Sequence, residues 1–213
     1  MLKKRFTELL LEIGASIEQA DTAWEELSTL YQEKGRAYHS LSHISHMLAL
    51  MDEHISEKSR SIELELAIWY HDVIYDPLSK ENEVRSADLA KRRLSSYSIL
   101  SDESLDNIYL LILSTQGHIA RIDGEGSLQN EWMLDLDLSI LGAEKEGYKL
   151  YTQQIRQEYH MYSPEDYKTG RSLVLKSFLQ RKEIYFSDLF KQLFEEKARE
   201  NLRNEIEDLS TDP

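Results

Sequence analysis

Apolar side chains recur at helical spacing along most of the chain. Between residues 104 and 115 they follow the steps of three and four residues that place side chains on one face of a helix: Leu105, Ile108, Leu111 and Ile112. Strict alternation of apolar and polar residues, which is typical of a half-buried strand, is rare and short. The segment IELELAIWY at 62–70 begins with alternation but becomes continuously apolar, and charged residues flank it. We interpret this segment as a central buried helix.

Helix-start signals and the scarcity of helix-breaking residues support the same interpretation. The chain has only three prolines and eight glycines. Ser101 precedes one periodic run, and Ser163 with Pro164 precedes another; serine is a favourable N-cap, and proline is tolerated at the first helical position. The sequence therefore predicts an all-α fold, a bundle of about nine or ten helices near residues 3–13, 19–34, 42–57, 60–75, 81–97, 103–116, 129–138, 144–161, 165–182 and 186–208. We expect one domain over residues 1–213, with a long loop at 117–128.

The charge balance indicates which classes of partner the protein can bind. Asp and Glu number 39 and Lys and Arg number 25, which gives a formal net charge of −14. Proteins bind nucleic-acid polymers mainly through basic side chains, so we expect no DNA or RNA partner. A small phosphorylated ligand held by a metal or by a local basic cluster is compatible with this charge.

The chain contains no cysteine. This excludes disulfides, thiolate nucleophiles and thiolate metal ligands, so any metal must bind His, Asp, Glu and water. Glu8 and Glu12 interrupt what would be the apolar region of a signal peptide. No run of about 18 uninterrupted apolar residues occurs, so we expect no membrane span and a cytoplasmic protein.

Residues that commonly bind metals occur inside three apolar segments. They are His39 and His43 in AYHSLSHISHM, the adjacent pair His71 and Asp72 in AIWYHDVIYD, and Asp135 and Asp137 in EWMLDLDLSILG. Burying imidazole and carboxylate groups costs several kcal/mol unless partners compensate them, and one divalent cation can compensate several at once. Imidazole and carboxylate ligands without thiolate suit Mn, Fe, Ni, Zn or Mg. The two aspartates have an alternative role as a helix cap.

This ordered set, a His, then an adjacent His-Asp pair, then a later Asp, resembles the HD superfamily of metal-dependent phosphohydrolases. Within that superfamily it is most similar to an uncharacterised bacterial branch of predicted HD-type phosphohydrolases. The resemblance is carried by YHSLSHISHM, WYHDVIYD, KENEVRSADLA, STQGH, LDLDLSILG, and YTQQIRQEY followed by Gly170 and Arg171. These stretches span roughly residues 30–180. The resemblance implies an HD-type helical bundle with this motif-bearing core and a C-terminal helix at 186–208.

The resemblance also implies four metal ligands, namely His43, His71, Asp72 and Asp137. His39 remains an alternative to His43, and Asp135 remains an alternative to Asp137. Superfamily members with two metals carry further histidines after the His-Asp pair, whereas this chain has Asn82 and Glu83 at the first such place. We therefore expect one divalent metal ion (Mn, Fe, Ni, Zn or Mg).

The expected reaction is hydrolysis of a small phosphate ester or nucleotide by a metal-activated water. We expect Glu83 to act as the base or as an orienting carboxylate, with Asp76 as the second choice, and His118 to act as an acid or to bind phosphate. The expected substrate-binding residues are Arg36, His39, Asn82, Arg85 and Arg156. Glu83 has a simpler alternative role as a first-turn carboxylate that the helix dipole favours.

Two functional classes remain open at this stage. The first is the phosphohydrolase, which the ligand set and the nearby carboxylate favour. The second is a catalytically inactive metal-binding helical module with a regulatory or interaction role, which the missing histidines allow. Oxygen chemistry at a two-iron centre would need more ligands than the sequence offers. The charged helix at 186–208 is compatible with a homodimer.

Overall fold

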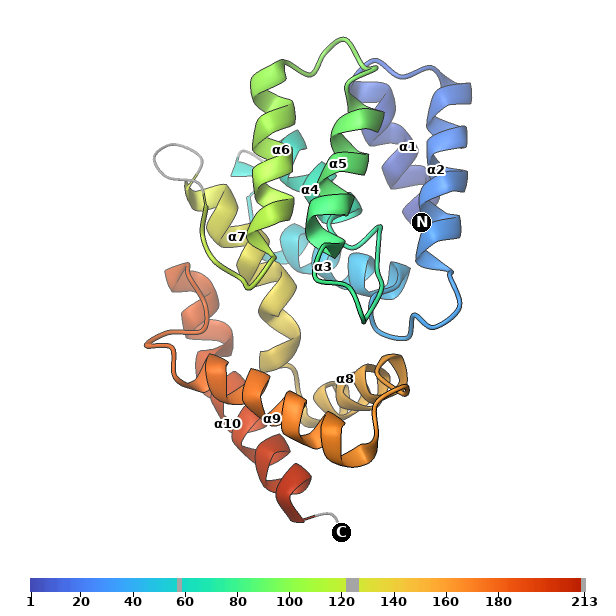
Figure 1. Cartoon of the computed structure of the whole chain (residues 1–213). Helices are drawn as coiled ribbons and strands as arrows, with labels where there is room; N and C mark the ends of the chain where they lie inside the picture. The colour runs from blue at the N-terminus through green and yellow to red at the C-terminus, as the bar shows by residue number, and fades with distance from the viewer. Residues whose placement is uncertain (57–58, 122–126, 212–213) are drawn as a thin grey trace. The chain divides into compact units, whose positions relative to one another are not determined.

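The computed structural model describes residues 1–56, 59–121 and 127–211. Within these ranges the chain forms ten α-helices and no strand, which confirms the predicted all-α fold (Figure 1). The helices are α1 (Leu2–Glu12), α2 (Ile17–Tyr31), α3 (Leu41–His54), α4 (Ile62–Tyr70), α5 (Asn82–Leu94), α6 (Asp102–Ser114), α7 (Ser127–Leu138), α8 (Lys145–Glu158), α9 (Pro164–Leu179) and α10 (Asp188–Thr211). None of these described helices is long and apolar enough to cross a membrane.

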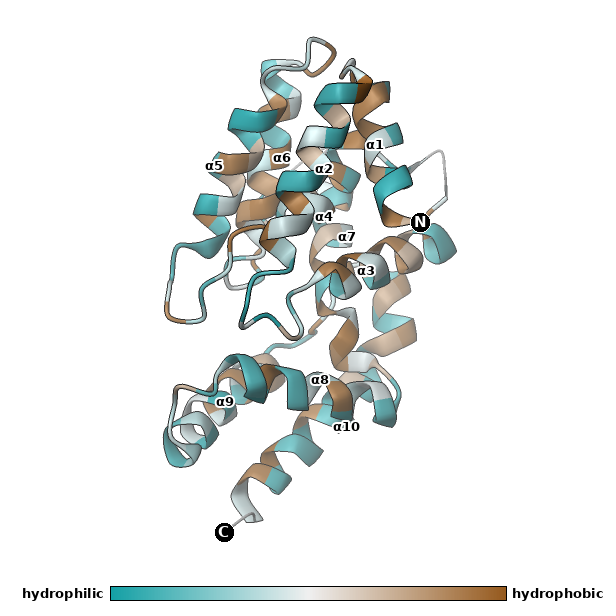
Figure 2. Ribbon diagram, turned by 90° about the vertical axis from the view of Figure 1, so that its right-hand side faces the viewer, coloured by the Kyte–Doolittle hydropathy of each residue, from teal (hydrophilic) through white to brown (hydrophobic). Residues whose placement is uncertain are grey.

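The predicted helix starts at Ser101 and Ser163 are confirmed. The Ser101 hydroxyl accepts a hydrogen bond from the backbone N–H of Ser104, and the Ser163 hydroxyl accepts one from Asp166. Each serine therefore satisfies one of the N–H groups that a helix leaves unpaired in its first turn. Figure 2 shows hydrophilic and hydrophobic bands alternating along α1 and α5, as expected for helices that bury one face.

The largest difference from the predicted boundaries is at the end of α4. The sequence predicts a helix over 60–75, but α4 ends at Tyr70 and residues 71–76 form an irregular turn. Side chains from distant elements bind the backbone of this turn, as described below. Hydrophobic periodicity cannot detect such contacts, because they depend on residues far away in the sequence.

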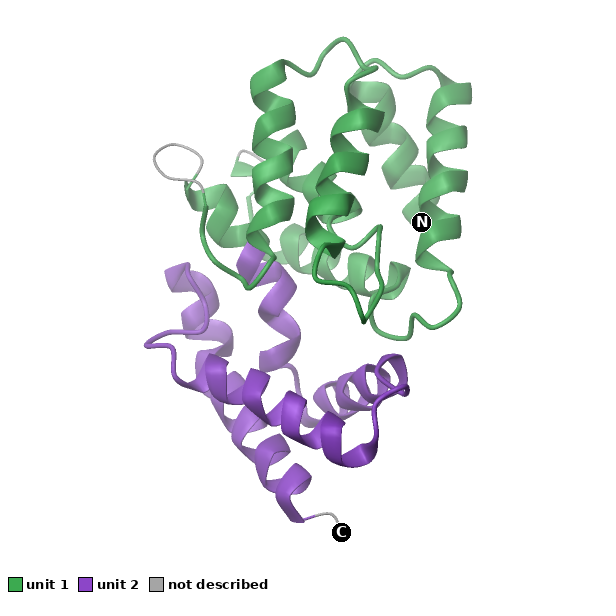
Figure 3. Ribbon diagram, in the orientation of Figure 1, with its two compact units in different colours: residues 1–133 green, residues 134–213 purple. Residues whose placement is uncertain are grey.

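The described chain divides into two compact units, residues 1–133 and residues 134–213 (Figure 3). The boundary falls inside α7, so the prediction of a single domain over residues 1–213 stays a prediction. We describe each unit by itself.

The first unit is built around α4. Leu66, Ala67 and Ile68 of this helix are completely buried, and α3, α5 and α6 pack against it. The rings of Phe6 and Trp69 join α1 to α4 in an edge-to-face contact with centroids 5.1 Å apart. Such close packing fixes the direction in which the end of α4 presents its last side chains.

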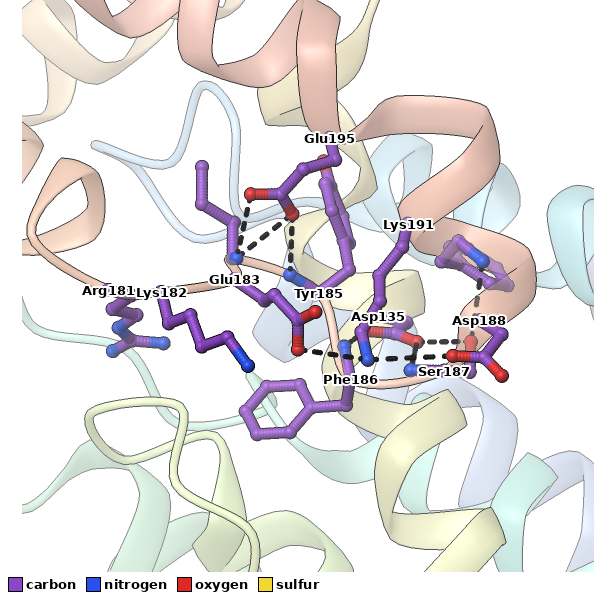
Figure 4. A network of polar contacts seen from close by, with 12 residues as sticks. Asp135, Arg181, Lys182, Glu183, Tyr185, Phe186, Ser187, Asp188, Lys191 and Glu195 are labelled. Atoms are coloured by element: carbon purple, nitrogen blue, oxygen red, sulfur yellow. Dashed lines mark hydrogen bonds and ion pairs between the residues drawn. The ribbon is translucent and has the colours of Figure 1, made fainter.

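The second unit contains α8, α9, α10 and the short 3-10 helix η3 (Ser139–Gly142). The segment that leads into α10 is held by carboxylates (Figure 4). Glu195 accepts hydrogen bonds from the backbone N–H groups of Ile184 and Tyr185, at 2.9 and 3.2 Å. Lys191 forms an ion pair with Glu183 at 3.1 Å. The entry into α10 is therefore fixed by hydrogen bonds from the backbone to Glu195 and by an ion pair between side chains.

Candidate metal centre

Two helix ends in the first unit present buried histidines to each other. His43 lies in the first turn of α3 and is 3% exposed. His71 follows the last residue of α4 as its C-cap, is 1% exposed, and is followed directly by Asp72. The two rings lie against each other, with centroids 5.3 Å apart, and the ring of Tyr38 lies 4.8 Å from that of His43.

His43, His71 and Asp72 place three potential ligand atoms close together. The Nε2 atoms of the two histidines are 3.3 Å apart. The Oδ2 atom of Asp72 lies 3.1 Å from Nε2 of His71 and 3.9 Å from Nε2 of His43. The first unit alone therefore brings two imidazoles and one carboxylate to one point.

The tautomer of His71 follows from its other ring nitrogen. Nδ1 lies 2.9 Å from the backbone carbonyl oxygen of Ile68. A carbonyl oxygen only accepts hydrogen bonds, so Nδ1 carries the proton and donates. Nε2 then directs either a lone pair or a second proton at Asp72. A lone pair facing a carboxylate oxygen at 3.1 Å is repulsive unless a cation lies between them.

The separations of Nε2 of His71 from Nε2 of His43 (3.3 Å) and from Oδ2 of Asp72 (3.1 Å) fit ligands of one divalent ion. With metal–ligand bonds of about 2.1 Å, ligand atoms lie about 3.4 Å apart around a tetrahedral ion and about 3.0 Å apart in cis positions around an octahedral one. A histidine that binds a metal through Nε2 usually donates its other N–H to a carbonyl or a carboxylate, as His71 does. His43 and His71 could therefore hold a metal ion.

The structure distinguishes between the two candidate histidines of the first motif. His39 precedes Ser40, the N-cap of α3, so it does not share a helical face with His43. Its ring stacks on Tyr75, with centroids 4.2 Å apart. His43, not His39, is the residue that lies against His71.

The structure also distinguishes between the two aspartates. Asp135 is completely buried, and its carboxylate accepts three hydrogen bonds: from the backbone N–H of Phe186 (2.7 Å), and from the backbone N–H (2.8 Å) and hydroxyl (2.6 Å) of Ser187 (Figure 4). These donors compensate its charge without a cation, and they lie just before α10. Asp135 thus holds the two residues that precede α10, whereas the first turn of that helix is capped by the Ser187 hydroxyl, which accepts from the N–H of Phe190 at 3.4 Å. Asp137 lies on the last turn of α7, in the second unit, and its assignment as a ligand stays a prediction.

Arg36 binds the backbone of the His-Asp turn. Its side chain is 2% exposed. Nη1 donates to the carbonyl oxygens of Asp72 (2.6 Å) and His39 (3.1 Å), and Nη2 donates to that of Val73 (2.8 Å). The guanidinium also lies over two aromatic rings, 5.2 Å from the centroid of Tyr31 and 5.5 Å from that of Tyr75. These contacts give Arg36 a positioning role, while the predicted role in phosphate binding is untested.

The start of α5 holds the other end of the same turn. Asn82 uses both ends of its amide on Asp76: Oδ1 accepts from the backbone N–H (3.0 Å), and Nδ2 donates to the carbonyl oxygen (2.9 Å). The hydroxyl of Ser86 accepts from the backbone N–H of Ile74 at 3.1 Å. Sequence reasoning missed Ser86, although its spacing of four residues from Asn82 places both on the inner face of α5.

The remaining predicted residues of the first unit lie in three places. The Asp76 carboxylate accepts a hydrogen bond from the N–H of Leu78 at 2.9 Å, which stabilises the loop before α5. Glu83 and Arg85 lie in the first turns of α5, Glu83 half-buried and Arg85 exposed. His118 follows α6 with a positive φ of 53°, a conformation in which His is enriched among non-glycine residues. Their catalytic and substrate-binding roles stay predictions.

Arg156 belongs to the second unit. Its guanidinium donates to the carbonyl oxygens of Tyr159 (2.7 Å) and Tyr162 (3.1 Å) beyond the end of α8, and lies over the ring of Tyr167. A cation at this helix end is favoured by the helix dipole. The predicted contact of Arg156 with a substrate phosphate stays a prediction.

No family model, no curated protein and no solved structure matches this chain. The function of the chain is therefore inferred from the residues of the site.

Proposed function

We propose that this protein is a metal-dependent phosphohydrolase of the HD type, which acts in the cytoplasm on a small phosphate ester or nucleotide. The observation that carries the proposal is the convergence of His43, His71 and Asp72, with Nδ1 of His71 fixed on a backbone carbonyl. The order of the sequence motifs, which resembles that of the HD superfamily, supports the same assignment.

In this proposal the chain holds a single divalent ion. His43 and His71 bind it through Nε2 and Asp72 through Oδ2, and Asp137 is the proposed fourth ligand. Asn82 stands where a second metal would need a histidine, and both ends of its amide are engaged by the backbone of Asp76. This occupancy supports one metal rather than two.

The ion would supply a Lewis acid for a phosphoryl oxygen and would lower the pKa of a water molecule. Glu83 is the proposed proton acceptor. Its side chain is half-buried and makes no hydrogen bond or ion pair with other residues in the described part of the chain, so its carboxylate is available. His118 is the proposed proton donor to the leaving group. Arg85, which is exposed on the same helix as Glu83, is the proposed phosphate contact.

Metal analysis combined with a phosphatase screen tests this function. We expect about one equivalent of a divalent metal in the purified protein and turnover of at least one small phosphate ester or nucleotide. His71→Ala and Asp72→Ala should lose the metal and all turnover, because a divalent site that lacks one ligand binds weakly. His160→Ala, which changes an exposed histidine of the second unit, is the matched control and should keep both.

The possible failures of this test have different meanings. A folded wild-type protein that binds no divalent metal would refute the metal centre itself. Stoichiometric metal without hydrolysis of any ester in the screen would instead assign the chain to the class of non-catalytic metal-binding modules.

A further inference from the structure

The second unit contains a cavity that the proposed function does not use. It has a volume of about 670 Å³ and lies between α8, α9 and α10. Sites for small molecules typically have volumes of roughly 300–1,000 Å³. None of the proposed metal ligands lines the cavity. We propose that it binds a small organic anion in which a flat ring carries a phosphate group, of the class of nucleoside monophosphates.

Glu205 lines one wall of the cavity, and Arg171, which is not itself a lining residue, pairs with it. Arg171 binds Glu205 through two nitrogens, at 2.7 and 3.1 Å, and both side chains are less than 10% exposed. The hydroxyl of Tyr148 donates to the same carboxylate. Burial, together with this carboxylate, raises the pKa of Tyr148, so its phenol keeps the proton that it donates. The wall is thus fixed before a ligand binds, and Arg171 compensates the charge of Glu205.

The cavity is basic although the protein is acidic. Four basic side chains line it, namely Lys145, Lys149, Arg156 and Lys168, against two acidic ones, Glu205 and Asp208. Since Arg171 already compensates Glu205, Asp208 is the main opposing charge. The whole chain carries a net charge of −14, so this balance is a local exception. A basic concave surface favours an anionic ligand.

Lys145 and Lys149 are the residues best placed to bind a phosphate. They are four residues apart on α8, which places both on one face of the helix. Both are exposed, and neither side chain forms an ion pair or hydrogen bond with the described residues. Two unengaged ammonium groups one helical turn apart can contact a single phosphate group from two directions.

The other lining groups suit a flat ring. Tyr148, Tyr167, Pro164 and Leu209 present apolar surface to the cavity. The guanidinium of Arg156 lies 4.7 Å from the centroid of the Tyr167 ring and so restricts its orientation. Asn204 adds an amide that can both donate and accept hydrogen bonds. A ring attached to a phosphate would use the apolar surface, the amide and the ammonium groups together.

Calorimetric titration of the full-length protein tests the proposal. The probe is a phosphonate analogue of adenosine 5′-monophosphate, which a phosphohydrolase cannot cleave. We expect saturable binding with a stoichiometry of about one in His71→Ala, in which the proposed metal centre does not compete for the probe. Adding Lys145→Glu and Lys149→Glu to this variant should weaken the binding at least about tenfold. The control adds the same two charge reversals outside the cavity, at Lys176 on α9 and Lys34 after α2, and should bind as His71→Ala does. Inorganic phosphate should bind more weakly than the phosphonate, because it has no ring.

Three results would overturn the proposal. The first is absence of phosphonate binding, and the second is equal weakening by the cavity variant and the control. The third is binding by the wild type that is lost in His71→Ala, which would place the ligand at the candidate metal centre. Since His71→Ala is expected to leave binding in the cavity unchanged, failure of this proposal and failure of the proposed function give different results.

Discussion

His71 uses its two ring nitrogens for different contacts. Nδ1 donates to the carbonyl oxygen of Ile68, one turn back along α4, and Nε2 faces His43 and Asp72. The first contact sets the orientation of the ring, and the second places a ligand atom in a buried position. A histidine fixed in this way loses little conformational freedom when it binds an ion, which increases affinity.

Arg36 provides a test of how the His-Asp turn is positioned. We expect Arg36→Met to lower the metal affinity by about 10- to 100-fold, because the carbonyl oxygens of Asp72 and Val73 lose their shared donor. The free energy of unfolding should fall by roughly 2–4 kcal/mol as buried acceptors are left unsatisfied. Metal titration and urea unfolding measure the two effects.

A second measurement separates positioning from general loss of stability. Added guanidinium ion should restore part of the metal affinity of Arg36→Ala, since it can occupy the vacated space and donate to the same carbonyls. Arg85→Ala, which changes an exposed arginine of α5, is the control and should need no rescue. Wild-type metal affinity in Arg36→Ala without guanidinium would contradict the positioning role.

The two aspartates of α7 form a matched pair for a further test. Asp135→Asn should lower the free energy of unfolding by roughly 1–3 kcal/mol, because charge-assisted hydrogen bonds to Phe186 and Ser187 are weakened. It should leave metal binding unchanged. Asp137→Asn should have the opposite effect, with weaker metal binding and little change in stability. Isothermal titration with Mn²⁺ measures metal binding, and urea unfolding measures stability. Weaker metal binding in Asp135→Asn, with destabilisation in Asp137→Asn, would contradict the assignment.

Among the elements, η3 depends on a close approach to α10. A Cβ atom at Gly142 would lie 2.6 Å from Cβ and 2.9 Å from the carbonyl oxygen of Phe194. We expect Gly142→Ala to destabilise the protein by at least about 2 kcal/mol, since the neighbouring atoms include backbone and cannot move aside easily. Gly147→Ala, in the first turn of α8, is the control, because its Cβ would meet only Ala143 at 3.6 Å. It should be neutral or stabilising by up to about 1 kcal/mol, and thermal unfolding would distinguish the two.

The elements also show what sequence reasoning can and cannot supply. Periodicity and capping residues such as Ser101 predict the helices, because these signals are local. The predicted end of α4 is wrong, because the turn after Tyr70 is held by side chains outside the helix, those of Arg36 and Ser86, which lie 36 and 12 residues from the backbone groups they bind. The convergence of His43 with His71 could be expected from the order of motifs. The contact of Asp135 with the residues before α10 could not be predicted, since its partners, Phe186 and Ser187, lie 51 and 52 residues further along the chain.

At the scale of the whole molecule, the net charge of −14 and the local basic groups act over different distances. At physiological ionic strength, charges are screened beyond about 8 Å. A long polyanion meets the acidic surface as a whole, whereas a small phosphate compound is affected mainly by the groups that touch it. The proposed phosphohydrolase substrate and the proposed ligand of the cavity are both small phosphate compounds, so the acidic net charge does not oppose either of them.

Whether His43, His71 and Asp72 bind one shared metal ion is tested most directly by anomalous scattering from a Mn²⁺-soaked crystal of the full-length protein. The structure predicts one strong peak, about 2.0–2.3 Å from Nε2 of His43, Nε2 of His71 and a carboxylate oxygen of Asp72. A crystal saturated with Mn²⁺ that shows no peak between these three side chains, with both rings hydrogen-bonded only to protein neighbours, would contradict the claim.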